Sequence, residues 1–179
     1  MNKVLITGTG RCGTTFLIKL FTFLGLDTGY TKANYRKSVF NNCNSGMERS
    51  HKEKYTYLKN PTFLINMKDI LSLYEKDLLV IIPIRSYEIS SKSRLKHGLN
   101  NGGLWNAKNL DEQINFYHKS IANYMLDVVK YDIDTIFLDF ERMVCDKHYL
   151  FERLSRIMQF ENISFDVFST EYDNSSKTC

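Results

Sequence analysis

Proline is nearly absent from the sequence, with 2 residues among 179, which excludes a proline-rich linker between domains. The 4 cysteines show neither a C-x-x-C pair nor an even spacing, so we expect free thiols in a reducing compartment. The length suits one domain with a sizeable core. Hydrophobic residues make up 43% and charged residues 25%, which predicts a globular chain and not a disordered one.

Long apolar segments are lacking as well. The longest one, Phe16 to Leu26, contains Lys19 and is too short to span a bilayer. The sequence enters a strand pattern almost at once and shows no signal-peptide cleavage pattern. These absences predict a cytoplasmic protein that does not engage a membrane.

The charge balance is mildly basic, with a formal net charge of +4 and a pI near 8.8. Such a charge suits an anionic small ligand as well as a nucleic acid. The lysines are scattered and do not form one stripe, so nucleic-acid binding is the least favoured function.

The N-terminal segment reads as a strand, a glycine-rich loop and a helix. Gly8 and Gly13 have the spacing of the phosphate-binding motif G-x-x-x-x-G-K-[ST], and Thr15 supplies its hydroxyl. The motif's lysine is replaced by Thr14, while Arg11 stands inside the loop. Backbone N–H groups and the positive end of the helix dipole make such a loop an anion site. The missing lysine counts against a kinase, because that lysine normally spans the β- and γ-phosphates.

The rest of the chain alternates strands and helices. We expect strands at 3–7, 56–59, 78–84 and 135–139, and helices at 14–24, 63–74, 86–97, from 109 onward and at 148–158. Residues 27–55 are expected to be mostly loop, with room for a short helix. The pattern predicts a single α/β domain over 1–179, a three-layer P-loop-type fold with a mainly parallel sheet flanked by helices. Its core is expected over about 3–160, and the tail 161–179 is left unassigned.

The segment Arg11-Cys-Gly-Thr-Thr-Phe-Leu17 resembles the [K/R]-S-G-T-T-x-L loop of sulfotransferases. These enzymes use 3′-phosphoadenosine 5′-phosphosulfate (PAPS) as the sulfuryl donor. The resemblance implies that Arg11 contacts the phosphosulfate and that Cys12 replaces a serine as a small residue, although a helix N-terminus can lower a thiol pKa. The donor-binding residues implied in this loop are Gly10, Arg11, Cys12, Gly13, Thr14, Thr15 and Phe16.

Two further segments are similar to the family in the same order. Arg85 ends a predicted strand and Ser93 follows eight residues later, as in the pair that holds the donor's 3′-phosphate, with Arg94 as a spare candidate. Lys59 corresponds to the strand-end lysine that points at the transferred group. Phe137 to Glu141 resembles the family's Y-E-D-L strand end, and we interpret Glu141 as structural.

The acceptor must lose a proton, which requires a base within hydrogen-bond reach. Cytosolic sulfotransferases carry a histidine two residues after the lysine, where this chain has Pro61. Glu48 and His51 are the first candidates to replace it, followed by Glu53. The family resemblance implies no metal ion.

The acceptor is expected to be a small molecule or a glycan, and the oligomeric state is left open. Tyr30, Tyr35 and Trp105 are candidates to line an aromatic, sugar or peptide site. Two alternative functions stay open: a P-loop kinase for a nucleotide or small metabolite, and a catalytically degenerate module that binds a nucleotide without transfer.

Overall fold

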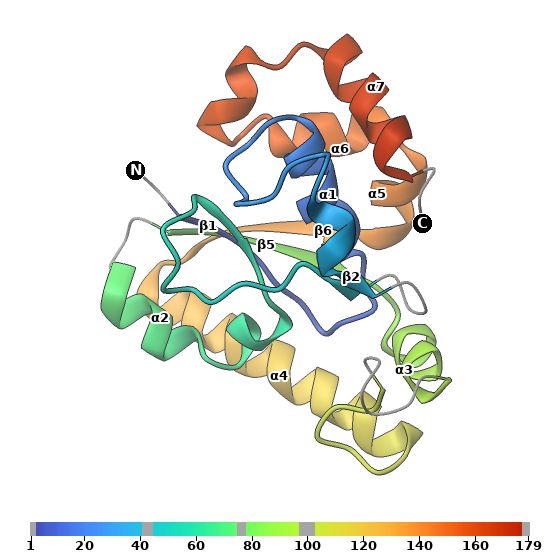
Figure 1. Ribbon diagram of the computed structural model, residues 1–179. Helices are drawn as coiled ribbons and strands as arrows, with labels where there is room; N and C mark the ends of the chain where they lie inside the picture. The colour runs from blue at the N-terminus through green and yellow to red at the C-terminus, as the bar shows by residue number, and fades with distance from the viewer. Residues whose placement is uncertain (1–2, 41–44, 75–77, 97–102, 177–179) are drawn as a thin grey trace.

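A central sheet of four strands, all parallel, organises the chain in order β4-β1-β5-β6 (Figure 1). The computed structural model describes residues 3–40, 45–74, 78–96 and 103–176. The strands are β1 (Lys3–Ile6), β4 (Tyr57–Lys59), β5 (Leu78–Ile84) and β6 (Asp134–Asp139). The prediction of an α/β fold with a parallel sheet is confirmed.

Helices cover both faces of the sheet, as Figure 1 shows. One face carries α1 (Thr14–Phe23), α5 (Phe140–Cys145), α6 (Lys147–Leu154) and α7 (Phe165–Ser176). The other carries α2 (Met67–Tyr74) and α4 (Leu110–Tyr131), and α3 (Tyr87–Leu95) follows the carboxyl end of β5. The connections include the 3-10 turns η1 (Tyr35–Ser38), η2 (Pro61–Leu64) and η4 (Met158–Asn162) and the two-stranded hairpin β2 (Val39–Phe40) and β3 (Ser45–Gly46).

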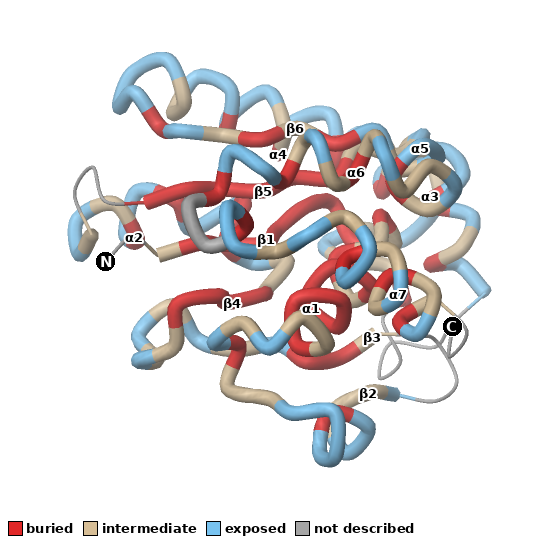
Figure 2. Tube along the Cα trace, turned by 90° about the horizontal axis from the view of Figure 1, so that it is seen from above, coloured by how far each residue is buried: buried red, intermediate tan, exposed pale blue. Residues whose placement is uncertain are grey.

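The central strands are buried on both sides, which explains their continuous apolar sequence (Figure 2). Alternate residues face opposite layers: Val4 and Ile6 of β1 join the core under α1, while Leu5 joins the core above α2 and α4. The sheet therefore separates two hydrophobic clusters.

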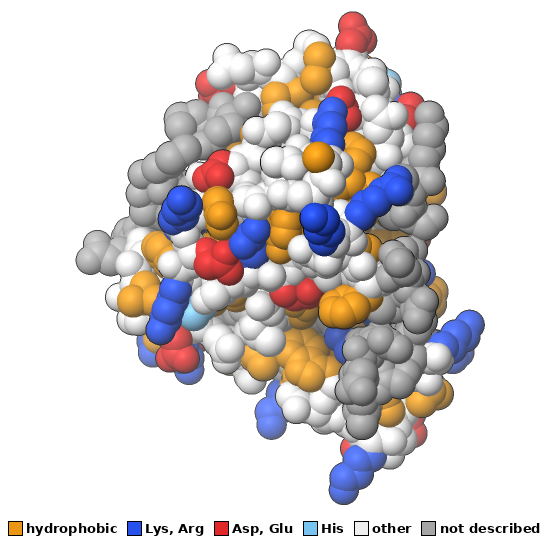
Figure 3. Space-filling model, viewed as in Figure 1, with side chains coloured by type: hydrophobic (Ala, Val, Ile, Leu, Met, Phe, Trp, Pro, Cys, Tyr) orange, Lys and Arg blue, Asp and Glu red, His pale blue; other side chains and the backbone are white. Residues whose placement is uncertain are grey.

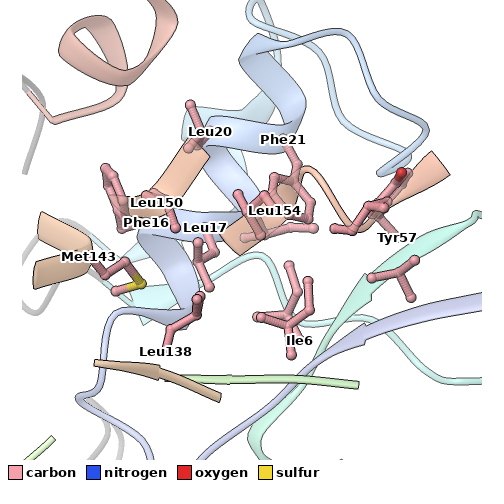
Figure 4. Close-up of a cluster of buried hydrophobic side chains, with 14 of the residues drawn as sticks. Ile6, Phe16, Leu17, Leu20, Phe21, Tyr57, Leu138, Met143, Leu150 and Leu154 are labelled. Carbon is pink, nitrogen blue, oxygen red and sulfur yellow. The ribbon is translucent and has the colours of Figure 1, made fainter. Parts of the chain in front are cut away.

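Helix α1 is apolar nearly all round because it is enclosed on both sides. Figure 4 shows Leu17, Leu20 and Phe21 among side chains of the sheet and of α6, including Leu138 and Leu154. The helix begins directly after the glycine-rich loop, so burial of α1 fixes the loop against the sheet.

The C-terminal part of the core extends beyond the expected limit near residue 160. The expected helix 148–158 ends at Leu154, and α7 follows after η4. Helix α7 packs on α1, with Phe168 and Tyr172 buried. The Tyr172 hydroxyl donates a hydrogen bond of 3.1 Å to the Met143 carbonyl.

Two expected helices differ from the structure. The expected helix 63–74 is divided into η2 and α2, because Asn60 caps a 3-10 turn that begins at Pro61. The helix expected from 109 onward is α4, which buries Tyr117 and Tyr124 and leaves Met125 41% exposed although an apolar residue favours burial. The buried face of α4 also carries Gln113 and Ser120, so hydrophobicity alone does not mark it.

Replacing Phe168 by alanine should lower the free energy of unfolding by about 3–5 kcal/mol, because the ring is fully buried in the core. The matched control is Val167→Ala in the same helix, where the side chain is 53% exposed and the change should stay within about 0.5 kcal/mol. Urea unfolding followed by circular dichroism measures both. Equal losses for the two variants would contradict the packing of α7 described above.

Candidate functional site

A pocket of about 510 Å³ lies at the carboxyl edge of the sheet, where parallel α/β sheets bind their ligands. Each strand contributes to its lining: Lys59 from β4, the loop after β1, Arg85 after β5 and Phe140 after β6. The lining residues are Gly10, Arg11, Gly13, Thr14, Thr15, Phe16, Lys19, Tyr35, Val39, Phe40, Ser45, Glu48, Lys59, Pro61, Arg85, Ser93, Arg94, Phe140, Val144 and Ser176.

The glycine-rich loop presents backbone to the pocket at the start of α1. Gly13 precedes the helix with a φ of 86° and no side-chain cap, so the first amides of α1 lack intrahelical acceptors. Gly10 has a φ of 78°, and a Cβ there would lie 2.2 Å from the Arg94 guanidinium. Arg11 itself adopts the left-handed region, with a φ of 57°. The loop is therefore held in a conformation that few other residues would permit.

Helix α3 and the loop are joined by two arginines. The Arg11 Nε donates to the Ser93 hydroxyl at 3.1 Å, and Arg85 Nη1 donates to the Arg11 carbonyl at 2.9 Å. The Arg85 Nε is buried and has no hydrogen-bond partner among the described residues. Three of the predicted donor-binding residues, Arg11, Arg85 and Ser93, thus lie together.

Arg94, the spare candidate, is 8% exposed and also lines the pocket. Its Nη1 donates to the Gly103 carbonyl at 2.5 Å, and its guanidinium lies 5.5 Å from the centre of the Trp105 ring. Because Gly10 packs directly against it, the Arg94 guanidinium supports the loop and also adds positive charge to the pocket.

Lys59 and Glu48 form an ion pair at the β4 end of the pocket. The Lys59 Nζ lies 2.5 Å from a Glu48 carboxylate oxygen and 2.9 Å from the Gly46 carbonyl. Burial lowers the pKa of Lys59, whose side chain is 2% exposed, and the Glu48 charge opposes that shift. The adjacent Arg49 N–H donates to the Lys59 carbonyl at 2.9 Å, which fixes the segment after β3 alongside β4. The structure therefore brings two predicted catalytic residues into contact.

Cys12 does not face the pocket. Its thiol is fully buried beneath the loop, where the backbone N–H groups of Gly10 and Cys12 point at the sulfur. Burial raises the pKa of the Cys12 thiol above its ordinary value, opposite to the shift that a helix N-terminus alone would cause. Cys12 thus packs as a small buried residue and contributes backbone to the loop.

Other predicted residues lie elsewhere. His51 is absent from the pocket lining; its ring packs edge-to-face on Phe63 at 6.2 Å, and its carbonyl accepts a hydrogen bond from the Tyr74 hydroxyl. Tyr35 lines the pocket, whereas Tyr30 packs against the Arg49 guanidinium. The predictions that concern Cys43, Cys179 and the helix end at His97 lie outside the described residues.

Sequence reasoning missed Lys19, a buried lysine of α1 that also lines the pocket. Its ammonium donates to the Ser175 carbonyl and lies 5.7 Å from the ring centres of Phe23 and Tyr35. Ser176, the last residue of α7, completes this part of the pocket. A single lysine within an otherwise apolar helix was the available signal.

The described part of the chain contains no group of three or more His, Cys, Asp or Glu side chains arranged to hold a metal ion. Among the helices of those same residues, none has the length and hydropathy needed to cross a membrane. Glu141 lies exposed in α5.

Compared with known proteins, the chain matches no protein-family model and has no significant match among curated proteins.

Cys12 should resist alkylation in the folded protein, since its thiol is buried and its pKa is raised. In a Cys43→Ser, Cys179→Ser background, iodoacetamide at neutral pH should modify exposed Cys145 on the order of a hundred times faster than Cys12. Peptide mass spectrometry quantifies each site, and guanidinium should abolish the difference. Comparable native rates would show that the loop does not enclose Cys12.

Proposed function

We propose that this protein transfers a sulfuryl group from PAPS to a hydroxyl or amine of an acceptor. The observation that carries the proposal is the contact between two distant segments of the pocket: Arg11 in the glycine-rich loop is bonded to both Arg85 and Ser93. These are the residues that the resemblance to sulfotransferases assigns to the two phosphate groups of the donor. Their convergence supports one donor site and argues against three unrelated polar positions.

The donor's two anionic groups have distinct candidate positions. The amides of Gly13 to Thr15, the α1 dipole and the Arg11 side chain suit the 5′-phosphosulfate. The Arg85 guanidinium and the Ser93 hydroxyl, which both line the pocket, suit the 3′-phosphate. A Cβ at Gly10 would meet the Arg94 guanidinium, so glycine at this position lets the loop pack directly on that cation.

The chemistry is an in-line displacement: the acceptor oxygen bonds to sulfur, the sulfur–oxygen bond to the 5′-phosphate breaks, and its electron pair remains on the phosphate. Lys59 and Arg11 offer positive charge to the developing negative charge, and preorganised donors are effective in this task. Glu48 accepts the acceptor's proton, with Lys59 holding its carboxylate at 2.5 Å. The structure favours Glu48 over His51 for this role by placing only the former in the pocket.

The kinase alternative is weaker at the same site. Thr14 lines the pocket where a kinase lysine would stand, and Glu48, which is engaged by Lys59, is the one acidic residue in the described lining. A degenerate module would share the nucleotide contacts and lack transfer. A cytoplasmic location is also proposed, in line with the free thiols of Cys12 and Cys145.

Thermal unfolding with 3′-phosphoadenosine 5′-phosphate, ATP with Mg²⁺, and AMP tests the nucleotide. The bisphosphate at about 100 times its Kd should raise Tm by roughly 5–10 °C, and AMP should not. Arg85→Ala should weaken bisphosphate binding roughly 10–100-fold, because charge-assisted bonds are lost. Lys92→Ala on α3, the helix that follows Arg85, removes an equal charge from a solvent-exposed pair and should change nothing. A shift with ATP and Mg²⁺ alone would favour the kinase.

Glu48→Gln should lower the rate of transfer from labelled PAPS by roughly 10²–10⁴-fold, because the amide cannot take the acceptor proton. The Kd for the bisphosphate should change little, since Glu48 contacts Lys59 and not the loop. Glu88→Gln, in an exposed pair on α3, is the charge-matched control. Undiminished transfer by Glu48→Gln would assign the base elsewhere, and the absence of transfer to every acceptor by wild type would favour the degenerate module.

A further inference from the structure

Arg49 directly follows Glu48 in the chain, and its side chain binds three other positions. Its Nε donates to the Thr28 carbonyl at 3.0 Å, and its Nη2 donates to the Gly29 carbonyl at 2.8 Å. Its Nη1 lies 2.6 Å from a carboxylate oxygen of Glu53. All three guanidinium nitrogens therefore have an acceptor, although the side chain is 18% exposed.

Two tyrosine rings contact the same guanidinium. Its central carbon lies 4.1 Å from the centre of the Tyr30 ring and 4.5 Å from that of the Tyr55 ring. Gly29 has a φ of 72°, and a Cβ there would lie 2.5 Å from the Tyr55 ring, so glycine at this position lets the ring reach the arginine. A planar, weakly hydrated guanidinium combines ring stacking with directed hydrogen bonds, which a lysine ammonium does not reproduce.

The backbone around Arg49 is fixed as well. The Arg49 N–H donates to the Lys59 carbonyl at 2.9 Å, and the Arg49 carbonyl accepts from the Asn60 side-chain amide at 3.3 Å. The Ser50 N–H donates to the Glu53 carboxylate at 2.9 Å. Glu53 therefore binds both the Arg49 side chain and the backbone that follows it, so the turn is held by its side chains and its main chain together.

Burial does not hold the Glu48 carboxylate in place, because that side chain is 36% exposed. Its ion pair with Lys59 has a partly exposed member, and solvent screens such a pair. The position of the carboxylate therefore depends on the backbone that carries it. A reacting group that is misplaced by about 1 Å can lose roughly a hundredfold in rate, so the turn beside Glu48 bears directly on proton transfer.

We propose that Arg49 is a positioning residue, which holds the Glu48 carboxylate against Lys59 by fixing the turn that carries it. This inference rests on the proposed function, in which Glu48 takes the acceptor's proton. Arg49 is absent from the lining of the pocket, so it acts through Glu48 and not on the reactants. The geometry of its guanidinium matters here and not its charge alone, because one ammonium cannot serve two carbonyls, a carboxylate and two rings at once.

Arg49→Lys keeps the charge and removes the planar fork. The kcat is measured for transfer from labelled PAPS to whichever of 2-naphthol, N-acetylglucosamine and a tyrosine-containing peptide the wild type accepts. It should fall roughly 10–100-fold, while the Kd for 3′-phosphoadenosine 5′-phosphate stays within about twofold, because the phosphate contacts lie elsewhere in the pocket. The matched control is Arg142→Lys, whose guanidinium lies 3.9 Å from the Tyr149 ring centre and 3.8 Å from Asp146 in an exposed pair. This control should change neither value.

A second measurement needs no transfer activity. Burial lowers the pKa of Lys59, and the Glu48 charge opposes that shift. When Glu48 leaves Lys59, this pKa falls further, so more of the amine is neutral and reactive. Acetylation of Lys59 by acetic anhydride should therefore be roughly tenfold faster in Arg49→Lys than in wild type, the effect of about one pKa unit. Peptide mass spectrometry measures it, and exposed Lys92 should react equally in both proteins.

Glu53→Gln guards against a folding defect in Arg49→Lys. Glu53 is more exposed than Arg49, and its substitution weakens the same turn by replacing a charged acceptor with a neutral one. Both measurements should change in the same direction as in Arg49→Lys, by roughly threefold. Circular dichroism and the bisphosphate Kd establish that each variant is folded, and if Arg49→Lys is not, Glu53→Gln decides.

The outcomes separate the inference from the proposed function. Unchanged acetylation of Lys59 in a folded variant would overturn the positioning role of Arg49 and leave the sulfotransferase in place. Faster acetylation without loss of transfer would remove Glu48 as the base, and the positioning role with it. A wild-type protein that binds no bisphosphate would instead overturn the proposed function, whatever the acetylation rates of the variants.

Discussion

Because β4, β1, β5 and β6 all run in the same direction, the chain leaves each strand at one edge of the sheet. The polar residues of the pocket come from distant parts of the sequence. They meet at the pocket because the shared strand direction brings them to the same edge of the sheet. The bonds from Arg11 to Ser93 and from Arg85 to Arg11 then lock the loop to α3. Burial of α1 beneath α6 and α7 keeps the loop from moving away from the sheet. On the face seen in Figure 3, lysine and arginine side chains are interspersed with acidic and hydrophobic ones.

Three buried cations around the pocket share one arrangement. Lys19, Lys59 and Arg94 each donate to a backbone carbonyl of a separate segment, namely at Ser175, Gly46 and Gly103. Burying a charge is costly unless it is paired and hydrogen-bonded, so these contacts reduce the penalty and tie the C-terminal helix, the hairpin and the chain before α4 to the site. The same charges lining one pocket give it a positive potential, which suits an anionic ligand.

Local chemistry in the sequence predicted much of the fold and part of the site. The strand-forming runs, the glycine-rich loop and the position of Arg85 after a buried strand are each defined by a few neighbouring residues. Sequence pattern and spacing are therefore enough to predict them. The sequence indicated Glu48 as one of several candidate bases in the loop, but it did not predict the contact of Glu48 with Lys59. The path of the loop depends on the Gly46 and Arg49 backbone contacts, which the sequence pattern does not reveal. The polar residues on the buried face of α4 and the contact of the Lys19 ammonium with Ser175 follow from tertiary packing, which local hydrophobicity does not specify.

Lys19 and Ser176 line the same pocket although 157 positions separate them in the sequence. During synthesis, the loop, Lys59 and Arg85 leave the ribosome long before α7, and domains generally complete their folding as units. A nascent chain that ends at α6 therefore lacks the wall that α7 supplies to the pocket. The finished pocket is a late product of folding, and a ligand that needs this wall gains its site only when the C-terminal helix docks on α1.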